Sequence, residues 1–271
     1  MLKILKYSFF DLMRSRWSYV YFAFYLALGF VLLFLNNDVN KAVITLMNII
    51  IVLTPLIGTI FGVMYYYNSK EFTELLLAQP IKRSTIFTGQ YLGISISLTL
   101  SLILGLGIPF LLYGLFMSSA IFEFALLLVV GTLLNFIFVA LAFNIALSNE
   151  NRIKGFGYAI LMWLFLAVIY DGVFLISLVM LNEYPLDKFA LFATMFNPID
   201  LSRILILLKL DISALLGYTG AVFKKFFGTE LGFFLSMGVM CLWVIFPVWR
   251  IRAKLKKKDF NNDPQYLEMN T

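Results

Sequence analysis

Six long apolar stretches, separated by short polar segments, run along most of the chain. An α-helix needs about 20 mainly apolar residues to cross the hydrocarbon core of a bilayer. We expect transmembrane helices at residues 17–35, 42–66, 92–116, 121–147, 156–181 and 231–249. The pattern predicts an all-α polytopic membrane protein, with one membrane domain at 1–250 and a basic to polar tail at 251–271.

Basic residues gather on one side of the predicted spans. Most of the 21 Lys and Arg residues lie in the N-terminal arm, in the loops after the second and fourth spans, and in the tail. Cytoplasmic loops of membrane proteins carry an excess of these residues. We therefore expect both termini to be cytoplasmic.

Composition excludes several classes of function. Hydrophobic residues make up 62% of the chain and charged residues 13%, far from the average of soluble domains. The net charge of +6 comes mainly from membrane-flanking residues that meet anionic headgroups, so we expect membrane lipid and no nucleic acid as a partner. The chain has no histidine, one cysteine and no G-x-x-x-x-G-K-[ST] run. We expect a non-catalytic subunit without a cofactor or metal of its own.

The N-terminal arm, residues 2–16, has the pattern of an amphipathic helix. Leu2, Leu5, Phe9, Leu12 and Arg16 recur at i+3 or i+4 spacing, with lysines elsewhere on the helix. This pattern is typical of a helix at the membrane interface. A plain extension of the first span is the alternative.

Small and polar residues inside the spans indicate close helix packing. Such residues let membrane helices approach one another or hydrogen-bond across their interface. In the third span they are Gly93, Ser95, Ser97, Ser101, Gly105 and Gly107, and in other spans Asn48, Asn135 and Asn144. We expect them to hold the bundle together.

The predicted cytoplasmic loop after the second span contains a short helix. Residues 70–78 have acids near their start and apolar residues behind them, and Pro80 closes the segment. A short, rigid, partly apolar helix between two spans is suited to receive force from a soluble partner. An ordinary surface helix is the alternative.

The run Glu71-x-x-Glu74-Leu-Leu-Leu-Ala-x-Pro80-x-x-Arg83 resembles the coupling-helix signature of type-2 ABC exporter permeases. In that family the helix sits on a cytosolic ATPase. The resemblance therefore implies ATP and Mg on a separate ATPase chain and assigns the coupling role to Glu71, Glu74, Leu75, Leu76, Pro80 and Arg83. Phe72 and Gln90 depart from the family, which commonly has Gly and Lys there.

The long segment 182–230 between the last two spans is expected outside the cytoplasm. Asn197 is suited to cap a helix that begins at Pro198, and Asp200 lies three residues before Arg203, close enough to pair. Apolar residues follow at helical spacing. We expect a pair of helices lying on the outer membrane surface.

The same segment resembles the permease of the nitrous oxide reductase maturation transporter. The matching run is Asn197-Pro-Ile-Asp200-Leu-x-Arg203, then Asp211, then Gly217-Tyr218-Thr-Gly220-Ala-Val-Phe223-x-x-Phe226-Phe227-Gly228. The resemblance implies a bacterial inner membrane, a second permease copy, a cytosolic ATPase pair and a periplasmic accessory protein, acting in biogenesis of the reductase's copper–sulfur site. On this resemblance the named residues form an outer partner contact or gate.

Two other functions fit parts of the pattern. A general type-2 ABC exporter of lipid, drug or peptide would share the cytoplasmic features and lack a dedicated outer partner. An ATP-independent channel or carrier would need repeat symmetry and several intramembrane charges.

Asp171 is the single acid well inside a predicted span. Placing a carboxylate at the centre of a bilayer costs roughly 3 kcal/mol even on lenient scales. Such a group faces a cavity or a partner, so a gate or a dimer contact is one interpretation. A packing pair nearer the outer interface is the other.

Sulfur-bearing residues on the last span invite a copper hypothesis. Met237, Met240 and Cys241 have i, i+3 and i+4 spacing, and soft sulfur ligands suit Cu(I). Met is also a common filler of apolar helices, and a lone Cys is usually a small hydrophobe. We expect no metal site here.

Overall fold

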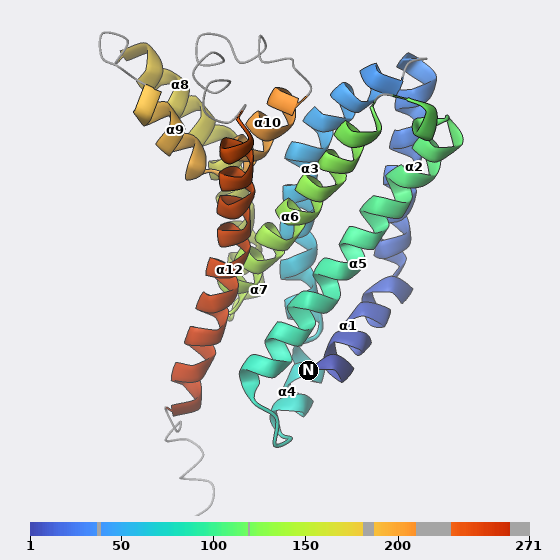
Figure 1. The fold of residues 1–271 in the computed structure, drawn as a ribbon. Helices are drawn as coiled ribbons and strands as arrows, with labels where there is room; N and C mark the ends of the chain where they lie inside the picture. Colours follow the sequence, from blue (N-terminus) through green and yellow to red (C-terminus); the bar gives the residue numbers. More distant parts are fainter. Residues whose placement is uncertain (37–38, 119, 181–186, 210–228, 261–271) are drawn as a thin grey trace, which may run out of the picture.

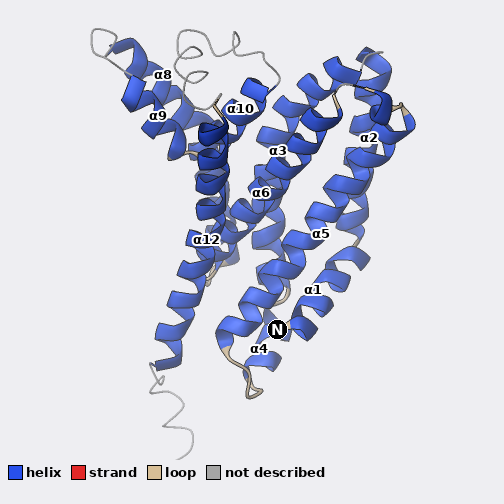
Figure 2. Cartoon of the chain, in the orientation of Figure 1, coloured by secondary structure: helices blue, strands red, loops and turns tan. Residues whose placement is uncertain are grey.

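The structure is a computed structural model that describes residues 1–36, 39–118, 120–180, 187–209 and 229–260 (Figure 1). These residues form helices joined by short turns, with no strand among them (Figure 2). In chain order the helices are α1 (Leu2–Arg14), α2 (Arg16–Asn36), α3 (Val39–Asn68), α4 (Lys70–Leu77), α5 (Arg83–Leu112), η1 (Leu115–Met117), α6 (Ile121–Ala146), α7 (Arg152–Leu164), η2 (Phe165–Ile169), α8 (Tyr170–Met180), α9 (Asp187–Met195), α10 (Pro198–Lys209) and α12 (Glu230–Phe260).

Six helices in the described part of the chain are long and apolar enough to cross a membrane. They are α2, α3, α5, α6, the continuous run α7–η2–α8, and α12. The all-α polytopic prediction is thereby confirmed. The third of these helices begins at Arg83 rather than Leu92, because residues 83–91 continue the helix and pack beneath α1.

The core of the bundle is formed by α3, α5 and α6. Half or more of the residues in their most apolar windows are buried (50, 56 and 56%), against 11% for α7–α8 and 22% for α12. The most extensive packing is α3 against α6 and α2 against α5. The fifth and last spans therefore present broad apolar faces outside the bundle.

One end of the bundle gathers the basic segments. The N-terminus, α4 and the C-terminal end of α12 lie together there, and the end of α10 lies opposite (Figure 1). We call this the basic end. By the positive-inside rule it is the end expected in the cytoplasm.

The N-terminal arm is a helix separate from α2. Ser15 has an extended backbone (φ −69°, ψ 143°), which ends α1 before α2 begins. The buried face of α1 contains Ile4, Ser8 and Leu12, whereas Leu2 is exposed. Helix α1 thus turns the face carrying Ile4 and Ser8 toward α5.

Two glycines of α5 allow neighbouring helices to come unusually close. A Cβ atom at Gly93 would lie 2.8 Å from the carbonyl oxygen of Leu5 in α1, and one at Gly105 would lie 2.7 Å from Cβ of Tyr25 in α2. No real Cβ atom tolerates such distances without movement of its surroundings. The predicted role of small residues in the third span therefore has a clear physical basis at both positions.

We expect Gly93→Val to lower the stability of the protein. The obstructing atoms at Gly93 belong to the α1 backbone, which cannot rotate away, and overpacking of this kind costs about 1–3 kcal/mol. Thermal unfolding of the detergent-purified chain measures the effect. Gly107→Val is the matched control, because no described atom of a neighbouring helix lies within 4 Å of a Cβ placed there. Equal unfolding temperatures for the two variants would contradict the α1–α5 contact.

Two of the three intramembrane asparagines connect helices. Asn135 Nδ2 lies 3.3 Å from Thr99 Oγ1 of α5, and Asn144 Nδ2 donates to the Pro247 carbonyl of α12 at 2.8 Å. Asn48 is exposed on α3 and forms no hydrogen bond with another described residue. The expectation of interhelical bonding is wrong for Asn48 because its side chain points out of the bundle.

Candidate functional site

The helix pair α9–α10 enters the bundle instead of lying on its surface. The two helices meet at an angle of 112°. At their turn, Asn197 Nδ2 donates to the Leu166 carbonyl at 2.7 Å, and Leu166 is the midpoint of the span Arg152–Met180. The turn thus lies at the middle of the fifth span, so the predicted placement on the outer membrane surface is wrong for the helix that begins at Pro198. The second helix of the predicted pair, after Asp211, lies outside the described residues.

The apolar pattern of α10 explains this placement. Its buried apolar residues are Ile199, Leu201, Ile204, Leu205, Ile206 and Leu207. They surround most of the helix rather than forming one stripe, and a helix that is apolar on nearly all sides is stable only when it is enclosed. Helices α3, α6 and α12 enclose α10.

A π-helical turn in the fifth span meets the re-entrant turn. Residues 165–169 (η2) adopt this wider geometry between α7 and α8. π turns interrupt the regular i→i+4 bonding and occur frequently at functional sites. Here the carbonyl of Leu166, within η2, accepts the side-chain amide of Asn197.

Asn197 is completely buried and uses both ends of its side chain. Its Oδ1 accepts the backbone N–H of Ile199 at 3.1 Å, which caps α10 as the sequence predicted. Its Nδ2 donates to the Leu166 carbonyl and also to Asp200 Oδ2, at 2.7 Å in each case. The side-chain amide of Asn197 therefore holds the start of α10, the π turn and one carboxylate in position relative to one another.

Asp171 of α8 and Arg203 of α10 form an ion pair. Arg203 Nη1 lies 3.0 Å from Asp171 Oδ2 and 3.6 Å from Asp200 Oδ1. The Asp171 and Arg203 side chains are each about 30% exposed, whereas that of Asp200 is 10% exposed. One guanidinium thus bridges two carboxylates on different helices. We call Asp171, Asn197, Asp200 and Arg203 the polar lock.

The polar lock lies between the middle and the end of the fifth span opposite the basic end. Asp171 follows Leu166 by five residues, a rise of about 7 Å along a helix. At that depth an unpaired carboxylate is costly, and the guanidinium offsets the cost. The partner of Asp171 is therefore a residue of its own chain, 32 positions away.

Aromatic and hydrogen-bond contacts hold α9 on both sides. Tyr170 donates its hydroxyl to the Ala193 carbonyl at 2.6 Å, and the Phe174 and Phe189 rings stack with centroids 6.4 Å apart. On the other side, Trp243 Nε1 of α12 donates to the Met195 carbonyl at 3.0 Å. These anchors have little signature in the local sequence, because each joins residues far apart in the chain.

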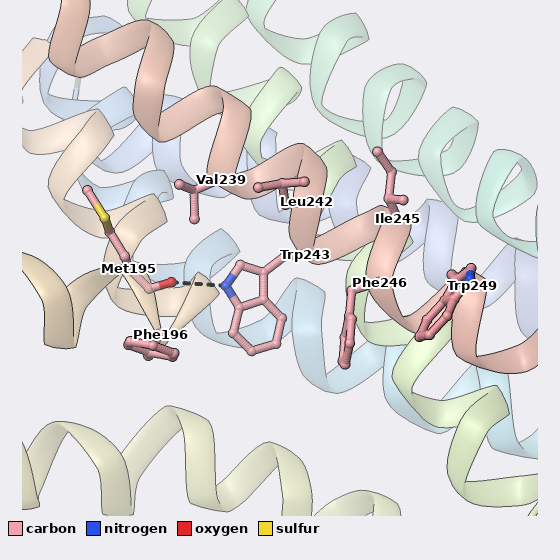
Figure 3. A pocket seen from close by; sticks show the side chains of 8 residues that line it. All are labelled: Met195, Phe196, Val239, Leu242, Trp243, Ile245, Phe246 and Trp249. Carbon is pink, nitrogen blue, oxygen red and sulfur yellow. Dashed lines mark hydrogen bonds between the residues drawn. The ribbon is translucent and has the colours of Figure 1, made fainter.

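An apolar groove of about 580 Å³ lies where α9 ends against α12. Figure 3 shows the Trp243 indole pointing toward the Met195 carbonyl within it. Its lining residues are Met195, Phe196, Val239, Leu242, Trp243, Ile245, Phe246 and Trp249. No charged side chain is among them, so the groove suits hydrocarbon or another apolar helix.

The sulfur-bearing residues of α12 do not form one ligand set. Met240 is fully buried, with Sδ 3.6 Å from Ser202 Oγ of α10, whereas Cys241 is exposed on another face. Met237 packs against the core. Met240 therefore contributes to α10 packing.

The coupling-signature helix α4 is docked on the bundle at the basic end. The rings of Phe72 and Tyr7 stack with centroids 4.3 Å apart, joining α4 to α1. Gln90 Nε2 of α5 donates to the buried Thr73 Oγ1 at 2.8 Å. Phe72 and Gln90, the two departures from the family pattern, thus form the inner contacts of α4.

The predicted coupling residues occupy mainly the outer side of α4. Glu71, Glu74, Leu75 and Pro80 are exposed, and Leu76 and Arg83 are partly buried. Leu75 is 69% exposed, high for a large apolar side chain. The Lys70–Glu74 pair, at 3.9 Å and well exposed, contributes little to stability. The outer side of α4 is therefore a small acidic and apolar surface.

Several predicted outer residues lie outside the described part of the chain. They are Asp211, Gly217, Tyr218, Gly220, Phe223, Phe226 and Phe227. The structure describes three of the residues predicted for the outer contact or gate, namely Asn197, Asp200 and Arg203. All three belong to the polar lock. The burial of Asn197 and Asp200 excludes direct contact of these two side chains with an outer protein in this conformation.

Six apolar helices and an enclosed re-entrant pair define a multi-pass α-helical membrane protein. No protein-family model matches the chain. It is similar to the probable ABC transporter permease protein NosY of Stutzerimonas stutzeri, with 27% identity over 179 residues, 64% of this chain and 58% of that protein. It is also similar to the protein of the same name from Pseudomonas aeruginosa, with 23% identity over 231 residues, 79% of this chain and 76% of that protein.

The chain thus resembles ABC transporter permeases, and among them those named NosY. The matched part spans less than two thirds of the first relative's length.

Proposed function

We propose that the chain is the membrane subunit of an ATP-driven type-2 ABC transporter. In this proposal α4 receives the motion of a cytosolic ATPase, and α9–α10 responds at the other end of the bundle. The observation that carries the proposal is the docking of α4, which is tied to α1 and α5 by its inner side and presents Glu71, Glu74 and Leu75 outward. ATP and Mg would be bound by the partner ATPase, and the chain itself would bind neither.

A continuous path of packed helices connects the two ends. Motion of α4 passes to α5 through Thr73 and Gln90, and α5 packs against α6. Helix α6 in turn contacts α10 and α12. Packed helices transmit displacement because their interfaces resist compression. In the proposed cycle, displacement along this path opens or closes the polar lock.

The polar lock fits a gate better than a binding surface. Its members form hydrogen bonds and ion pairs with one another, and these can exchange between two arrangements when α8 and α10 separate. We place the contact with an outer partner on the extracytoplasmic segment as a whole, moved by α10.

The proposed biological role is maturation of the copper–sulfur site of nitrous oxide reductase. The support is the Asn197–Gly228 pattern, together with similarity to proteins named NosY. A periplasmic accessory protein would receive motion or cargo at the outer end. A second permease copy would complete the transporter, and the exposed apolar faces of α7–α8 and α12 leave room for it.

Affinity purification of the tagged chain from its native host in mild detergent tests this role. Mass spectrometry identifies the co-purifying proteins, and native mass spectrometry counts the permease copies. Two permeases with an ATPase and a periplasmic protein would support the proposal. An ATPase alone would favour a general exporter, and recovery of neither would refute the ABC assignment.

We expect Leu75→Asp to weaken ATPase association at least tenfold. The substitution replaces the one large apolar side chain that is strongly exposed on α4 with a charged one. Loss of a central interface residue commonly costs about 2 kcal/mol or more of binding free energy. Co-purified ATPase per permease is the measurement. Ile153→Asp is the control, because Ile153 is 82% exposed at the start of α7, outside α4. Equal ATPase recovery from both variants would refute the role of α4.

A further inference from the structure

An open groove of about 450 Å³ runs along the exposed face of α1. Its lining residues are Lys3, Lys6, Tyr7, Phe10, Asp11 and Arg14. All six are exposed, and they follow one another at the three- and four-residue spacing of a single helix face or directly beside it. The opposite face of α1, with Ile4, Ser8 and Leu12, is buried against the bundle. The groove therefore lies on the outer side of α1 and belongs neither to the polar lock nor to the outer side of α4.

The groove carries a net positive charge. Three cations line it against one acid, Asp11. Arg16, exposed at the start of α2, adds a fourth cation two residues after Arg14. None of these four cations forms an ion pair with another described residue. Their charge is therefore available to an anionic partner.

The groove lies next to the expected boundary of the membrane. Helix α2 has 21 residues, a rise of about 32 Å, which is close to the roughly 30 Å thickness of the hydrocarbon core. Because α1 directly precedes α2, it lies beyond that core, toward the basic end (Figure 1). Trp17 and Tyr19, at the start of α2, are 59 and 63% exposed. Exposed Trp and Tyr are enriched at the level of the headgroups.

Two aromatic side chains lie among the cations. Tyr7 and Phe10 are 48 and 47% exposed. A helix that presents cations together with large apolar side chains binds at the surface of a membrane, where the apolar side chains enter the boundary between headgroups and acyl chains. Groups of four or more Lys and Arg beside a membrane-spanning helix are typical sites for anionic headgroups. These features favour a lipid over an acidic protein as the partner.

We propose that the exposed face of α1 binds the headgroups of anionic phospholipids. The three cations of the groove supply charge and N–H donors to the phosphate oxygens, and Phe10 contacts the adjoining acyl chains. Tyr7 also stacks on Phe72 of α4, so a lipid bound here lies beside the helix with the coupling signature. The inference goes beyond the proposed function, because ATPase coupling does not require an anionic lipid.

The experiment uses the full chain in detergent after removal of bound lipid. Native mass spectrometry follows titration with dioleoylphosphatidylglycerol, and with dioleoylphosphatidylcholine, which has the same chains and no net charge. We expect phosphatidylglycerol to bind more tightly than phosphatidylcholine. Replacing both Lys6 and Arg14 with glutamine is expected to raise the apparent Kd for phosphatidylglycerol roughly tenfold or more, and to leave the Kd for phosphatidylcholine nearly unchanged.

Matched variants separate the α1 face from general charge and from folding. Lys154→Gln with Arg252→Gln removes the same number of charges from exposed positions on α7 and α12, and is expected to leave the Kd for phosphatidylglycerol nearly unchanged. Lys6→Arg with Arg14→Lys keeps both cations and is expected to bind phosphatidylglycerol as the unchanged chain does. A variant with a disrupted fold would not.

Each outcome supports or overturns the proposal. Selective binding of phosphatidylglycerol that the Lys6 and Arg14 glutamine variant loses, and the control retains, supports it. Equal binding of the two lipids, or equal loss in the two glutamine variants, overturns it. If phosphatidylglycerol binding persists in the Lys6 and Arg14 variant while a co-purifying acidic protein is lost, the face belongs to a protein partner and the proposal is also overturned. Because no ATPase is present in the titration, the result is independent of the proposed coupling role.

Discussion

Replacing Arg203 with methionine is expected to abolish coupled ATP turnover of the proposed transporter complex and to destabilise the chain. The substitution leaves the carboxylates of Asp171 and Asp200 facing each other without the cation between them. Breaking a buried ion pair costs 3–5 kcal/mol, and partial exposure reduces the expected loss here to about 1–3 kcal/mol. Thermal unfolding and ATPase assays of the purified complex measure the two effects.

Two further variants test whether the pairing itself matters. Arg203→Lys keeps the charge and is expected to retain part of the stability, whereas the exchanged pair Asp171→Arg with Arg203→Asp restores opposite charges in reversed positions. Recovery in the exchanged variant would identify the Asp171–Arg203 contact as the cause. Arg252→Met removes an exposed arginine of α12 and is the control for loss of charge. A fully stable and active Arg203→Met protein would contradict the polar lock.

Replacing Asn197 with leucine is expected to have the second large effect. The change removes the cap of α10 and leaves the Leu166 carbonyl and one Asp200 oxygen without their amide donor. Loss of a cap costs about 1 kcal/mol, and each buried group left unsatisfied costs a further ~1–3 kcal/mol. We expect a total loss of at least ~3 kcal/mol on these magnitudes, seen as reduced folded yield and a lower unfolding temperature.

Asn48→Leu is the matched control for this experiment. Asn48 is an exposed asparagine on a membrane-spanning helix without a hydrogen bond to another described residue. Its replacement by leucine is expected to be neutral. If the two leucine variants unfold at the same temperature, the hydrogen bonds of Asn197 do not hold the re-entrant turn in place.

Hydropathy and helix signals predicted the elements of this fold well. Apolar length identified six spans, and the Asn-Pro-Ile-Asp pattern identified the beginning of α10. These features depend on local sequence. The small residues of the third span also indicated close packing, which Gly93 and Gly105 bear out.

Placement of the elements depended on contacts that local sequence does not encode. The apolar residues of α10 indicate an enclosed helix, but which helices enclose it (here α3, α6 and α12) depends on contacts between distant parts of the chain. Asp171 and Arg203 were each singled out, yet their pairing required α9–α10 to fold back along α8. The π turn has no local signature that the chain displays.

The family signature was most informative where the chain departs from it. Phe72 and Gln90 occupy inner contacts of α4, while Glu71, Glu74 and Leu75 remain available on its outer side. A change at an inner position alters how the helix is held on the bundle. A change at an outer position would alter what it binds.

The most direct test of the central claim is a distance measurement between the re-entrant pair α9–α10 and α12. Spin labels are attached at Phe192 of α9 and Ile245 of α12, which are both exposed, in a Cys241→Ala background that lacks the native thiol. Pulsed electron paramagnetic resonance then measures the distance between the two labels in the complete complex. Labelled chain diluted into unlabelled chain restricts the signal to one protomer. The account predicts a change of a few ångströms between the nucleotide-free and ATP-trapped states, the scale on which packed helices shift. An unchanged distance in a complex that hydrolyses ATP would contradict coupling from α4 to α9–α10.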